Sequence, residues 1–362
     1  MRSIRIFIYD VTHPGGVERA AVNLANSMVD EFKVTIISQF SSNGTPFYEI
    51  DPRVRILHLG VDFTPGIKNY VTQNIKTLVK IKRSISFDRD SISIGMSVNI
   101  NSLLAIIKIL GGSGIFFGCE HMNYDEATKI AQMVRKSTYK KLDRVIVLTE
   151  AEKDVFQKQL GLRISVIPNS LPLFPKYPAK LESKRMLCVG RYTYQKGFDR
   201  LIPIISSLMR SREDWELFIF GAGEQEDELR RLISLNQLNN IHLAPPTSNI
   251  EKEYLDSSIY LLPSRFESFG MVILEAQACG LPVVAYDSSN GPRSLISETN
   301  GILIDDGDGP EFSAAVEKLM DDLEYRRRLG QSGRLNAQNY NPDIIRQRWL
   351  SLINHVRSGE HS

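Results

Sequence analysis

The strongest constraint on the fold is a series of short, nearly continuous apolar runs separated by helical patterns. The run at 4–11, IRIFIYDV, is typical of a strand buried on both faces, and a Gly-Gly turn and an amphipathic helical pattern follow it. Similar runs predict strands at 33–39, 91–97, 114–120, 144–150, 185–190, 215–221, 240–244, 258–263 and 281–287. Alternating strands and helices predict an α/β protein with parallel sheets.

A proline-rich tract divides this pattern into two successive α/β units. We predict an N-terminal domain at 1–168, a linker at 169–184 and a second domain at 185–335. A last helix at 342–358 is expected to pack back on the N-terminal domain. Its apolar stripe consists of Ile344, Ile345, Trp349, Leu352, Ile353 and Val356. In such sheets, ligands bind beyond the carboxyl ends of the strands.

The composition is that of an ordinary globular protein. With 42% hydrophobic and 24% charged residues, the chain fits neither a disordered nor a collagen-like nor a disulfide-stapled class. Its three cysteines are far apart and have no metal-ligand spacing, which suits a reducing cytosol. The apolar stretch at the N-terminus is too short for a signal peptide. No run approaches the ~18 apolar residues of a membrane span.

The charge is unevenly distributed. Residues 1–170 carry a net charge of +6 and residues 171–362 a net charge of −4, which suits an anionic partner of the first half as well as chance variation. Lys76, Lys80 and Arg83 fall along one face of a helical segment at 67–85. Ile75, Leu78, Val79 and Ile85 of this segment are expected to pack. A second basic cluster consists of Arg135, Lys136, Lys140 and Lys141. Solvated surface charge is the alternative for both clusters.

Three junctions between a strand and a helix carry residues suited to an anionic ligand. At the first, Gly15 and Gly16 let backbone N–H groups approach an anion at a helix N-terminus. A tight turn without a ligand is the simpler alternative for a lone Gly-Gly pair. G-x-G-x-x-G is absent after this strand, and FGAGEQEDEL at 220–229 contains only G-x-G, which disfavours a nicotinamide oxidoreductase.

The second junction is VGRYTYQKGFDRLI, where a strand ends at Gly190 and a loop leads into a helix. Arg191 and Lys196 in this loop are two cations at the carboxyl end of a strand, which suits a diphosphate. Arginine binds phosphate oxygens through a fork of N–H groups, and lysine acts as a point charge. Two solvated surface charges are the alternative.

The third junction, PSRFESFGMVILEAQACGLPVVA at 263–285, contains Glu267 and Glu275. Glu267 lies in the predicted loop, whereas Glu275 lies inside a mostly apolar helix, where a carboxylate needs a hydrogen-bonding partner. The start of this helix at Phe269–Val272 offers unpaired N–H groups and a positive dipole end. A salt bridge to a nearby Arg or Lys is the structural alternative for Glu275.

Together, ESFGMVILEA followed by GLPVVA, GRYTYQKGFDRLI and GGVERA resemble the retaining glycosyltransferase family 4. The resemblance runs from residue 4 to about residue 335. It implies the GT-B fold, in which two Rossmann-like domains face a central cleft that holds the active site. The segment SNGPRSLI at 289–296 has one glycine, Gly291, and has Ser294 where the family usually has glutamate. This variant is similar to members that build bacterial surface polysaccharide or lipid-linked oligosaccharide.

The resemblance also implies a role for each matching residue. Glu275 corresponds to the glutamate that binds the ribose hydroxyls of the donor, and Glu267 to the one that contacts the transferred sugar. Arg191 and Lys196 correspond to the pair that grips the donor diphosphate. His121, in CEHMNYD, corresponds to the histidine beside the donor sugar and completes the expected catalytic set. Further donor-binding positions are Gly15, Gly16, Asn169, Phe269, Gly270, Met271 and Val272.

This set of residues suits the breaking of a sugar–phosphate bond. The reaction leaves negative charge on a diphosphate and cationic character on the sugar. Fixed cations and a helix N-terminus stabilise the first, and a carboxylate or carbonyl near the anomeric carbon stabilises the second. Neither a divalent metal nor a cofactor is expected, and DRD at 88–90 is interpreted as a solvated loop.

The predicted function is transfer of a hexose or N-acetylhexosamine from a nucleotide diphosphate sugar, UDP-linked by resemblance, to a growing glycan. The expected acceptor is a polyprenyl-diphosphate-linked or lipid-anchored saccharide. Lys76, Lys80 and Arg83 are expected to bind either the diphosphate of this acceptor or an anionic membrane surface. We expect a cytoplasmic protein, peripheral at the inner face of the cytoplasmic membrane, without a nucleic acid partner. A nucleotide-sugar epimerase of the same architecture and a non-catalytic nucleotide-sugar-binding protein are the alternatives.

Overall fold

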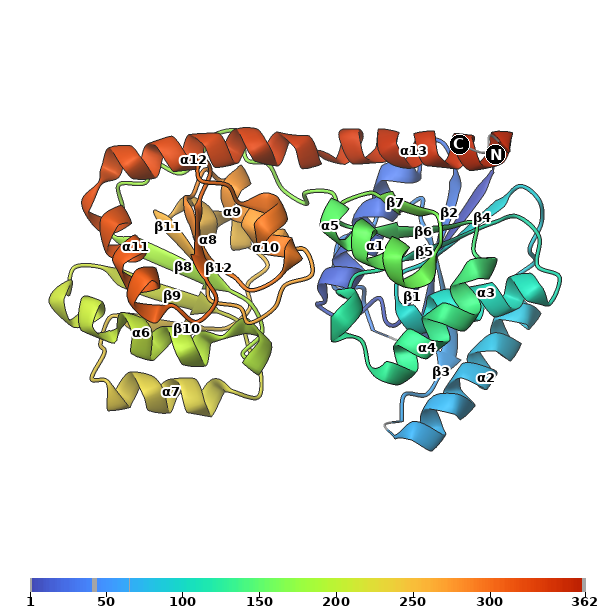
Figure 1. The fold of residues 1–362 in the computed structure, drawn as a ribbon, viewed down its shortest axis with the longest axis horizontal. Helices are drawn as coiled ribbons and strands as arrows, with labels where there is room; N and C mark the ends of the chain where they lie inside the picture. Colours follow the sequence, from blue (N-terminus) through green and yellow to red (C-terminus); the bar gives the residue numbers. More distant parts are fainter. Residues whose placement is uncertain (1, 41–43, 65, 360–362) are drawn as a thin grey trace. The chain divides into compact units, whose positions relative to one another are not determined.

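The chain forms two α/β units, each with a parallel sheet of its own (Figure 1). The computed structural model describes residues 2–40, 44–64 and 66–359. Unit 1 consists of residues 1–170 and 342–362, and unit 2 of residues 171–341. The α/β class and the presence of two parallel sheets, which the alternating apolar runs predicted, are confirmed.

Unit 1 contains a sheet of seven strands in the order β3-β2-β1-β4-β5-β6-β7. Its strands are β1 (Ser3–Ile8), β2 (Lys33–Phe40), β3 (Arg55–Val61), β4 (Ser91–Gly95), β5 (Ile115–Cys119), β6 (Arg144–Val147) and β7 (Ile164–Val166). Its α-helices are α1 (Gly16–Met28), α2 (Ile67–Ser84), α3 (Val98–Ile109), α4 (Lys129–Thr138), α5 (Glu150–Leu160) and α13 (Pro342–Ser358). The two edge strands, β3 and β7, were not predicted from the sequence.

Helix α13 follows unit 2 in the sequence but packs on α1 of unit 1. Ile345, Trp349 and Ile353 are at most 5% exposed and belong to the same core as β1, β4 and β5. An ion pair joins Arg346 to Glu31 next to this contact (2.6 Å). The amphipathic pattern of the helix therefore fits the surface it covers. Ile344, which the predicted apolar stripe included, is 42% exposed.

Unit 2 contains a sheet of six strands in the order β10-β9-β8-β11-β12-β13. Its strands are β8 (Arg185–Val189), β9 (Glu216–Phe220), β10 (Ile241–Ala244), β11 (Ile259–Leu262), β12 (Val283–Asp287) and β13 (Ile302–Asp305). Its α-helices are α6 (Phe198–Ser211), α7 (Glu226–Leu235), α8 (Ile250–Leu255), α9 (Met271–Ala278), α10 (Asn290–Leu295), α11 (Gly309–Asp321) and α12 (Leu323–Ala337). A separate hydrophobic core fills the space between this sheet and helices such as α6 and α11.

The proline-rich tract has neither helix nor strand at 171–184, but it is anchored to unit 2. Ala179 N–H donates to the carbonyl of Cys279 (2.8 Å). Arg326 donates to the carbonyl of Leu181, a residue that is 4% exposed. The second half of the tract is therefore held against the unit rather than free in solution.

Removing the Trp349 side chain should lower the free energy of unfolding by about 3–5 kcal/mol, because a buried aromatic ring leaves a cavity behind. The test is urea unfolding of Trp349→Ala followed by circular dichroism. Ile344→Ala on the same helix is the matched control and should change stability by less than about 0.5 kcal/mol. Equal losses from the two variants would contradict the packing of α13 described above.

Candidate active site

In unit 2, the predicted residues gather at the carboxyl edge of the sheet. Lys196 lies in the loop after β8 and Glu267 in the loop after β11, and these two strands are neighbours. The Lys196 ammonium forms an ion pair with Glu267 Oε1, and the two side chains are 15% and 9% exposed. Ser264 Oγ donates to the same carboxylate oxygen (3.0 Å). Arg191, at the start of the first loop, has an exposed side chain.

The two loops are fastened to each other by backbone and side-chain contacts. Arg200 of α6 donates to the carbonyl of Pro263 (2.7 Å). Arg265 binds the carboxylate of Asp199 with two N–H groups, both at 2.8 Å. Gly197 has φ +71°, and a Cβ there would lie 2.1 Å from the carbonyl oxygen of Pro263. Only glycine allows this approach, so the loops act as one rigid support for Lys196 and Glu267.

A third segment, after β12, clamps the backbone that carries Glu267. Ser289 Oγ accepts a hydrogen bond from Glu267 N–H (2.8 Å) and donates one to the Glu267 carbonyl (2.7 Å). A Cβ on Gly291 would lie 2.4 Å from the Glu267 carbonyl and 2.8 Å from Phe269 N. The sequence had indicated this segment because of Ser294, whose hydroxyl donates to the Gly291 carbonyl (2.7 Å). Ser289 was missed, although it follows a strand as the other site residues do.

Glu275 has a partner that the sequence did not reveal. It lies in α9, is 1% exposed, and accepts a hydrogen bond from the hydroxyl of Tyr254 in α8 (3.0 Å). Burial, and to a smaller extent the nearby Glu275 carboxylate, raises the pKa of Tyr254. The hydroxyl therefore stays protonated and donates a hydrogen bond to Glu275. The helix begins at Met271 after Gly270, which has φ +87°. The Ile273 N–H donates to the Gly270 carbonyl (2.9 Å), whereas helix geometry gives the N–H groups of Met271 and Val272 no acceptor within the helix.

In unit 1, the structure brings together His121 and Asn169. Both line a small cavity of about 20 Å³ next to Trp349 of α13, which is room for about one water molecule. The Nε2 atom of His121 is buried and has no hydrogen-bond partner among the described residues. Burial lowers the pKa of His121 to about 4, so the imidazole is neutral at pH 7.

The Gly-Gly turn of unit 1 has an acidic neighbour, Glu18. Helix α1 begins at Gly16, with Gly15 as its N-cap. A Cβ on Gly15 would lie 2.1 Å from Oε2 of Glu18, whereas one on Gly16 would meet open space. Because Glu18 is only 8% exposed, its carboxylate lies over the turn and opposes a second negative charge at that position.

Two family models match the chain, and between them they cover most of both units. The model described as Glycosyltransferase Family 4 matches residues 14–173, and the model described as Glycosyl transferases group 1 matches residues 171–336. This chain belongs to the family 4 glycosyltransferases. The resemblance inferred from GGVERA, GRYTYQKGFDRLI and ESFGMVILEA is thereby confirmed.

Relatives match the glycosyltransferase over almost its whole length. It is 29% identical over 360 residues to an uncharacterised glycosyltransferase of Haemophilus influenzae, covering 98% of this chain and 100% of the relative. It is 26% identical to the amylovoran biosynthesis glycosyltransferase AmsD of Erwinia amylovora, with coverage of 98% and 100%. An N-acetyl-D-galactosaminyltransferase of Campylobacter jejuni, whose name specifies an undecaprenol-linked saccharide, is 21% identical, with coverage of 97% and 98%.

Solved structures confirm the GT-B fold of the glycosyltransferase. TarM of S. aureus, crystallised with UDP among its ligands, has a TM-score of 0.82 at 17% identity and covers 98% of this chain and 100% of TarM. The sucrose-phosphate synthase of Thermosynechococcus elongatus has a TM-score of 0.84 at 19% identity, with coverage of 99% and 100%. At these identities the likeness concerns the fold alone.

The predicted surface clusters of the glycosyltransferase need two corrections. Arg135 is not a surface residue: its side chain is 0% exposed and forms an ion pair with Glu120 (2.5 Å), whereas Lys136, Lys140 and Lys141 are exposed as predicted. On α2, two of the four residues expected to pack face solvent. Ile75 is 59% and Val79 40% exposed.

The three cations of the predicted basic stripe on α2 differ in their exposure to solvent. Lys76 and Arg83 are exposed, as the stripe requires. Lys80 is half-buried, and its ammonium donates to the carbonyl of Gly60 (2.5 Å). The exposed face of α2 thus combines the exposed cations of Lys76 and Arg83 with the apolar side chains of Ile75 and Val79.

Acidification should destabilise the glycosyltransferase partly through His121. Burial lowers its folded-state pKa to about 4, whereas an unfolded histidine titrates near ~6.5. Between these values the unfolded state binds the additional proton, so stability is lost as the pH falls, by roughly 2–3 kcal/mol at pH 4. His121→Asn should remove this part of the pH dependence, measured by urea unfolding between pH 7 and pH 4.

His58→Asn is the control for this prediction, because His58 is an exposed histidine of the same unit. It should leave the pH dependence of the wild-type protein in place. Parallel stability curves for His121→Asn and the wild type would contradict the prediction.

Proposed function

We propose that this glycosyltransferase moves a hexose or N-acetylhexosamine from a UDP-sugar to a lipid-linked saccharide, with retention of the anomeric configuration and without a metal. The observation that carries the proposal is the Lys196–Glu267 ion pair at the carboxyl edge of the unit 2 sheet, where Ser289 fixes the backbone of Glu267. The reaction belongs to the synthesis of surface polysaccharide or lipid-linked glycan. The names of the Erwinia and Campylobacter relatives support this assignment.

In the proposed mechanism, Lys196 pairs with Glu267 before the donor binds and with the donor diphosphate afterwards. Lys196 and Glu267 are nearly buried, and removing one partner would leave the other charge uncompensated, at a cost of about 3–5 kcal/mol. A donor diphosphate competes for Lys196, assisted by Arg191 and the N–H groups at the start of α9. The Glu267 carboxylate is then available to the sugar. Positive charge thus stabilises the leaving diphosphate, and negative charge lies on the side of the cationic sugar.

Glu275 binds the ribose in this proposal. Its carboxylate accepts from Tyr254 through Oε2. A carboxylate has about four acceptor sites and can also accept hydrogen bonds from two vicinal hydroxyls. Tyr254 holds the group in one orientation, because both side chains are buried. The carboxylate is therefore preorganised before the donor binds.

His121 and Asn169 of unit 1 are uncharged at pH 7 and suit the uncharged hydroxyls of a sugar. His121 keeps one ring nitrogen buried and without a partner among the described residues, and Asn169 lines the same cavity. A neutral imidazole can donate to or accept from a sugar hydroxyl without adding charge beside the diphosphate. We therefore assign His121 and Asn169 to the sugar rather than to phosphate binding. The backbone N–H groups of Gly15 and Gly16 are likewise assigned to uncharged groups of the donor, because the Glu18 carboxylate opposes a negative charge at this turn.

A thermal-shift screen against nucleotide sugars tests the proposed function. At 100 times its dissociation constant, a ligand stabilises the folded state by about 2.7 kcal/mol. UDP-glucose and UDP-N-acetylglucosamine should raise the Tm, whereas ADP and GDP sugars should not. Glu275→Gln should remove most of the shift, whereas Glu267→Gln should retain binding and slow UDP release, since only Glu267 faces the reacting sugar.

Three results would contradict the proposal. Absence of a shift with every nucleotide sugar would exclude donor binding. Interconversion of UDP-sugars without an acceptor would favour the epimerase, and binding without any UDP release would favour a non-catalytic protein. Equal kinetic effects of Glu267→Gln and Glu275→Gln would contradict the division of roles between the two carboxylates.

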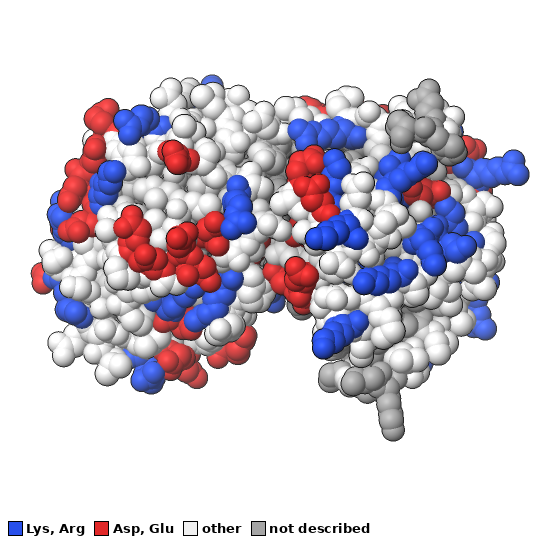
Figure 2. Space-filling model, viewed as in Figure 1, with Lys and Arg blue, Asp and Glu red and all other residues white. Residues whose placement is uncertain are grey.

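We propose that the exposed face of α2 meets an anionic membrane surface. No helix in the described part of the chain has the length and apolarity to cross a bilayer. Lys76 and Arg83 lie near three apolar side chains of the same helix that are 40–59% exposed, those of Val71, Ile75 and Val79. On the face shown in Figure 2, Lys and Arg outnumber acidic side chains over unit 1. Cations beside apolar side chains are typical of helices that lie in a membrane interface.

Reversing Lys76, Lys80 and Arg83 to glutamate should weaken binding to vesicles that contain phosphatidylglycerol by at least about a hundredfold, because each lost cation is worth about 1 kcal/mol. The measurement is vesicle sedimentation, with UDP binding as a check on folding. Reversing the exposed Lys136, Lys140 and Lys141 is a control of equal charge. Equal vesicle binding by the α2 variant and the wild type would contradict the proposed surface.

A further inference from the structure

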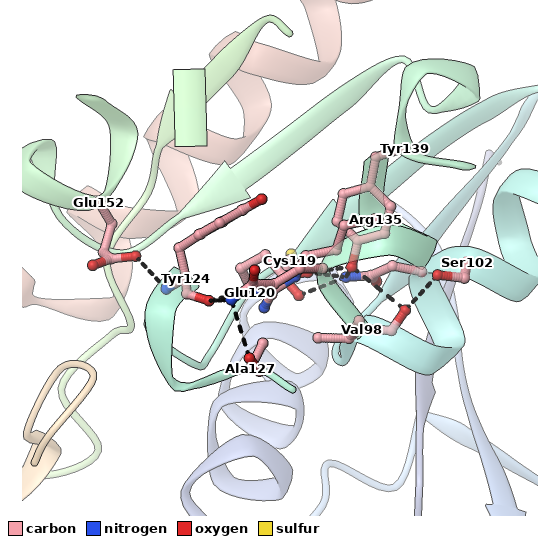
Figure 3. A network of polar contacts seen from close by, with 11 residues as sticks. Val98, Ser102, Cys119, Glu120, Tyr124, Ala127, Arg135, Tyr139 and Glu152 are labelled. Carbon is pink, nitrogen blue, oxygen red and sulfur yellow. Dashed lines mark hydrogen bonds and ion pairs between the residues drawn. The ribbon is translucent and has the colours of Figure 1, made fainter. Parts of the chain in front are cut away.

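A buried charge pair lies directly under the loop that carries His121. Glu120 and Arg135 have side chains that are 1% and 0% exposed, and Arg135 NH2 donates to Glu120 Oε2 (2.5 Å). The other carboxylate oxygen accepts hydrogen bonds from Tyr139 Oη and from Asn101 Nδ2 (3.1 Å). Figure 3 shows the side chains of Glu120, Arg135 and Tyr139 close together; Glu120 follows β5, Arg135 lies on α4 and Tyr139 follows α4. We call Asn101, Glu120, Arg135 and Tyr139 the Glu120 network.

The sheet is shaped to admit this network. Gly95 of β4 and Gly118 of β5 are register partners. A Cβ on Gly95 would lie 2.2 Å from Asn101 Oδ1, and one on Gly118 would lie 3.1 Å from Asn101 Cγ. Two adjacent glycines thus open a notch in the sheet for the Asn101 amide, which also donates to the Cys119 carbonyl (2.9 Å). The network is therefore tied to the last residue of β5 and to the first residue beyond it.

The same network holds the far side of the His121 loop. Arg135 NH1 donates to the Tyr124 carbonyl (3.2 Å), and its guanidinium lies 5.3 Å from the centre of the Tyr124 ring. The Tyr124 N–H donates to Glu152 Oε2 (3.1 Å). His121 is therefore flanked by two anchored residues, Glu120 before it and Tyr124 after it. Arg135 bonds to both anchors.

Stability alone does not account for this arrangement. A buried ion pair replaced by apolar residues of similar volume often leaves a protein as stable or makes it more stable. The Glu120 network instead fixes geometry, because each acceptor oxygen of Glu120 has a directional donor. We propose that Glu120 and Arg135 are positioning residues that hold the imidazole of His121 in the orientation used for sugar transfer. The inference rests on the proposed role of His121 in that reaction.

The first test is spectroscopic and requires no substrate. In the full-length chain, labelled on its six histidines, the His121 resonances are assigned by their loss in His121→Gln. In the double variant Glu120→Gln/Arg135→Met, which leaves no unpaired charge, the His121 signals should shift by more than their linewidth or broaden. Tyr139→Phe, which removes one donor and keeps the ring, should cause a smaller change in the same signals and serves where the double variant folds poorly.

The control is a buried arginine elsewhere. Arg326 is 6% exposed in unit 2, where it donates to the carbonyls of Leu181 and Met320. Arg326→Met should lower the Tm without moving the His121 resonances. If the network were only structural, the double variant would behave in the same way as this control.

The second test is kinetic coupling. UDP release is measured in water without acceptor, with the UDP-sugar that gives the largest thermal shift. The double variant should release UDP slower by on the order of tenfold to a hundredfold, since small displacements of a reacting group have effects of this size. In the His121→Ala background, the same double substitution should have no further effect, because the pair acts through His121.

The outcomes separate the inference from the proposed function. Unmoved His121 signals in folded Glu120→Gln/Arg135→Met and Tyr139→Phe overturn the inference. Additive rate effects in the His121→Ala background overturn it as well. If His121→Ala releases UDP at the wild-type rate while the signals do move, the network positions His121 but the proposed catalytic role of His121 fails.

Discussion

Parallel pairing of the strands determines where this protein can do chemistry. Every strand pair in the described sheets is parallel, so all carboxyl ends of a sheet open at one edge. The loops after β8 and β11 are separated by many residues in the sequence, but the strands are neighbours. Lys196 and Glu267 can therefore form an ion pair. His121 and Asn169 meet at one cavity in unit 1 for the same reason.

At a few positions, glycine lets neighbouring loops, or a strand and a polar side chain, come into direct contact. Gly197 brings the loop after β8 against Pro263, and Gly291 brings α10 against the backbone of Glu267. Gly95 and Gly118 make room for a polar side chain inside a sheet. At each position a methyl group would overlap with an atom that takes part in the site or supports it. The geometry of the polar groups thus depends on the absence of side chains beside them.

The sequence predicted features that depend on local pattern. Apolar runs located most strands, and the position of Lys196 and Glu267 after strands followed from the βα alternation. The edge strands β3 and β7 were missed because one is mixed in polarity and the other has three residues. Strand β13, at the edge of the second sheet, was also missed.

The sequence could not reveal contacts between distant residues. Arg135 was assigned to the surface because it lies among lysines, but its partner Glu120 lies just beyond the end of β5, fifteen residues earlier. Tyr254 and Ser289 have ordinary surroundings in the sequence. Each acquires a role only through the glutamate it contacts, Tyr254 through the Glu275 carboxylate and Ser289 through the backbone of Glu267. Ile75 and Val79 show the converse, since a helical apolar pattern does not specify whether the matching surface is protein or lipid.

The place of α13 in the chain has a consequence for how the protein is made. Its buried side chains complete the core of unit 1, but a ribosome reaches them only after it has synthesised all of unit 2. Domains generally fold as units during synthesis, with the N-terminal one first. Here part of the apolar surface of unit 1 stays uncovered until the ribosome has synthesised unit 2 and then α13. Maturation of unit 1 is thereby delayed until unit 2 has been synthesised, and a nascent chain arrested before residue 342 leaves unit 1 without its covering helix.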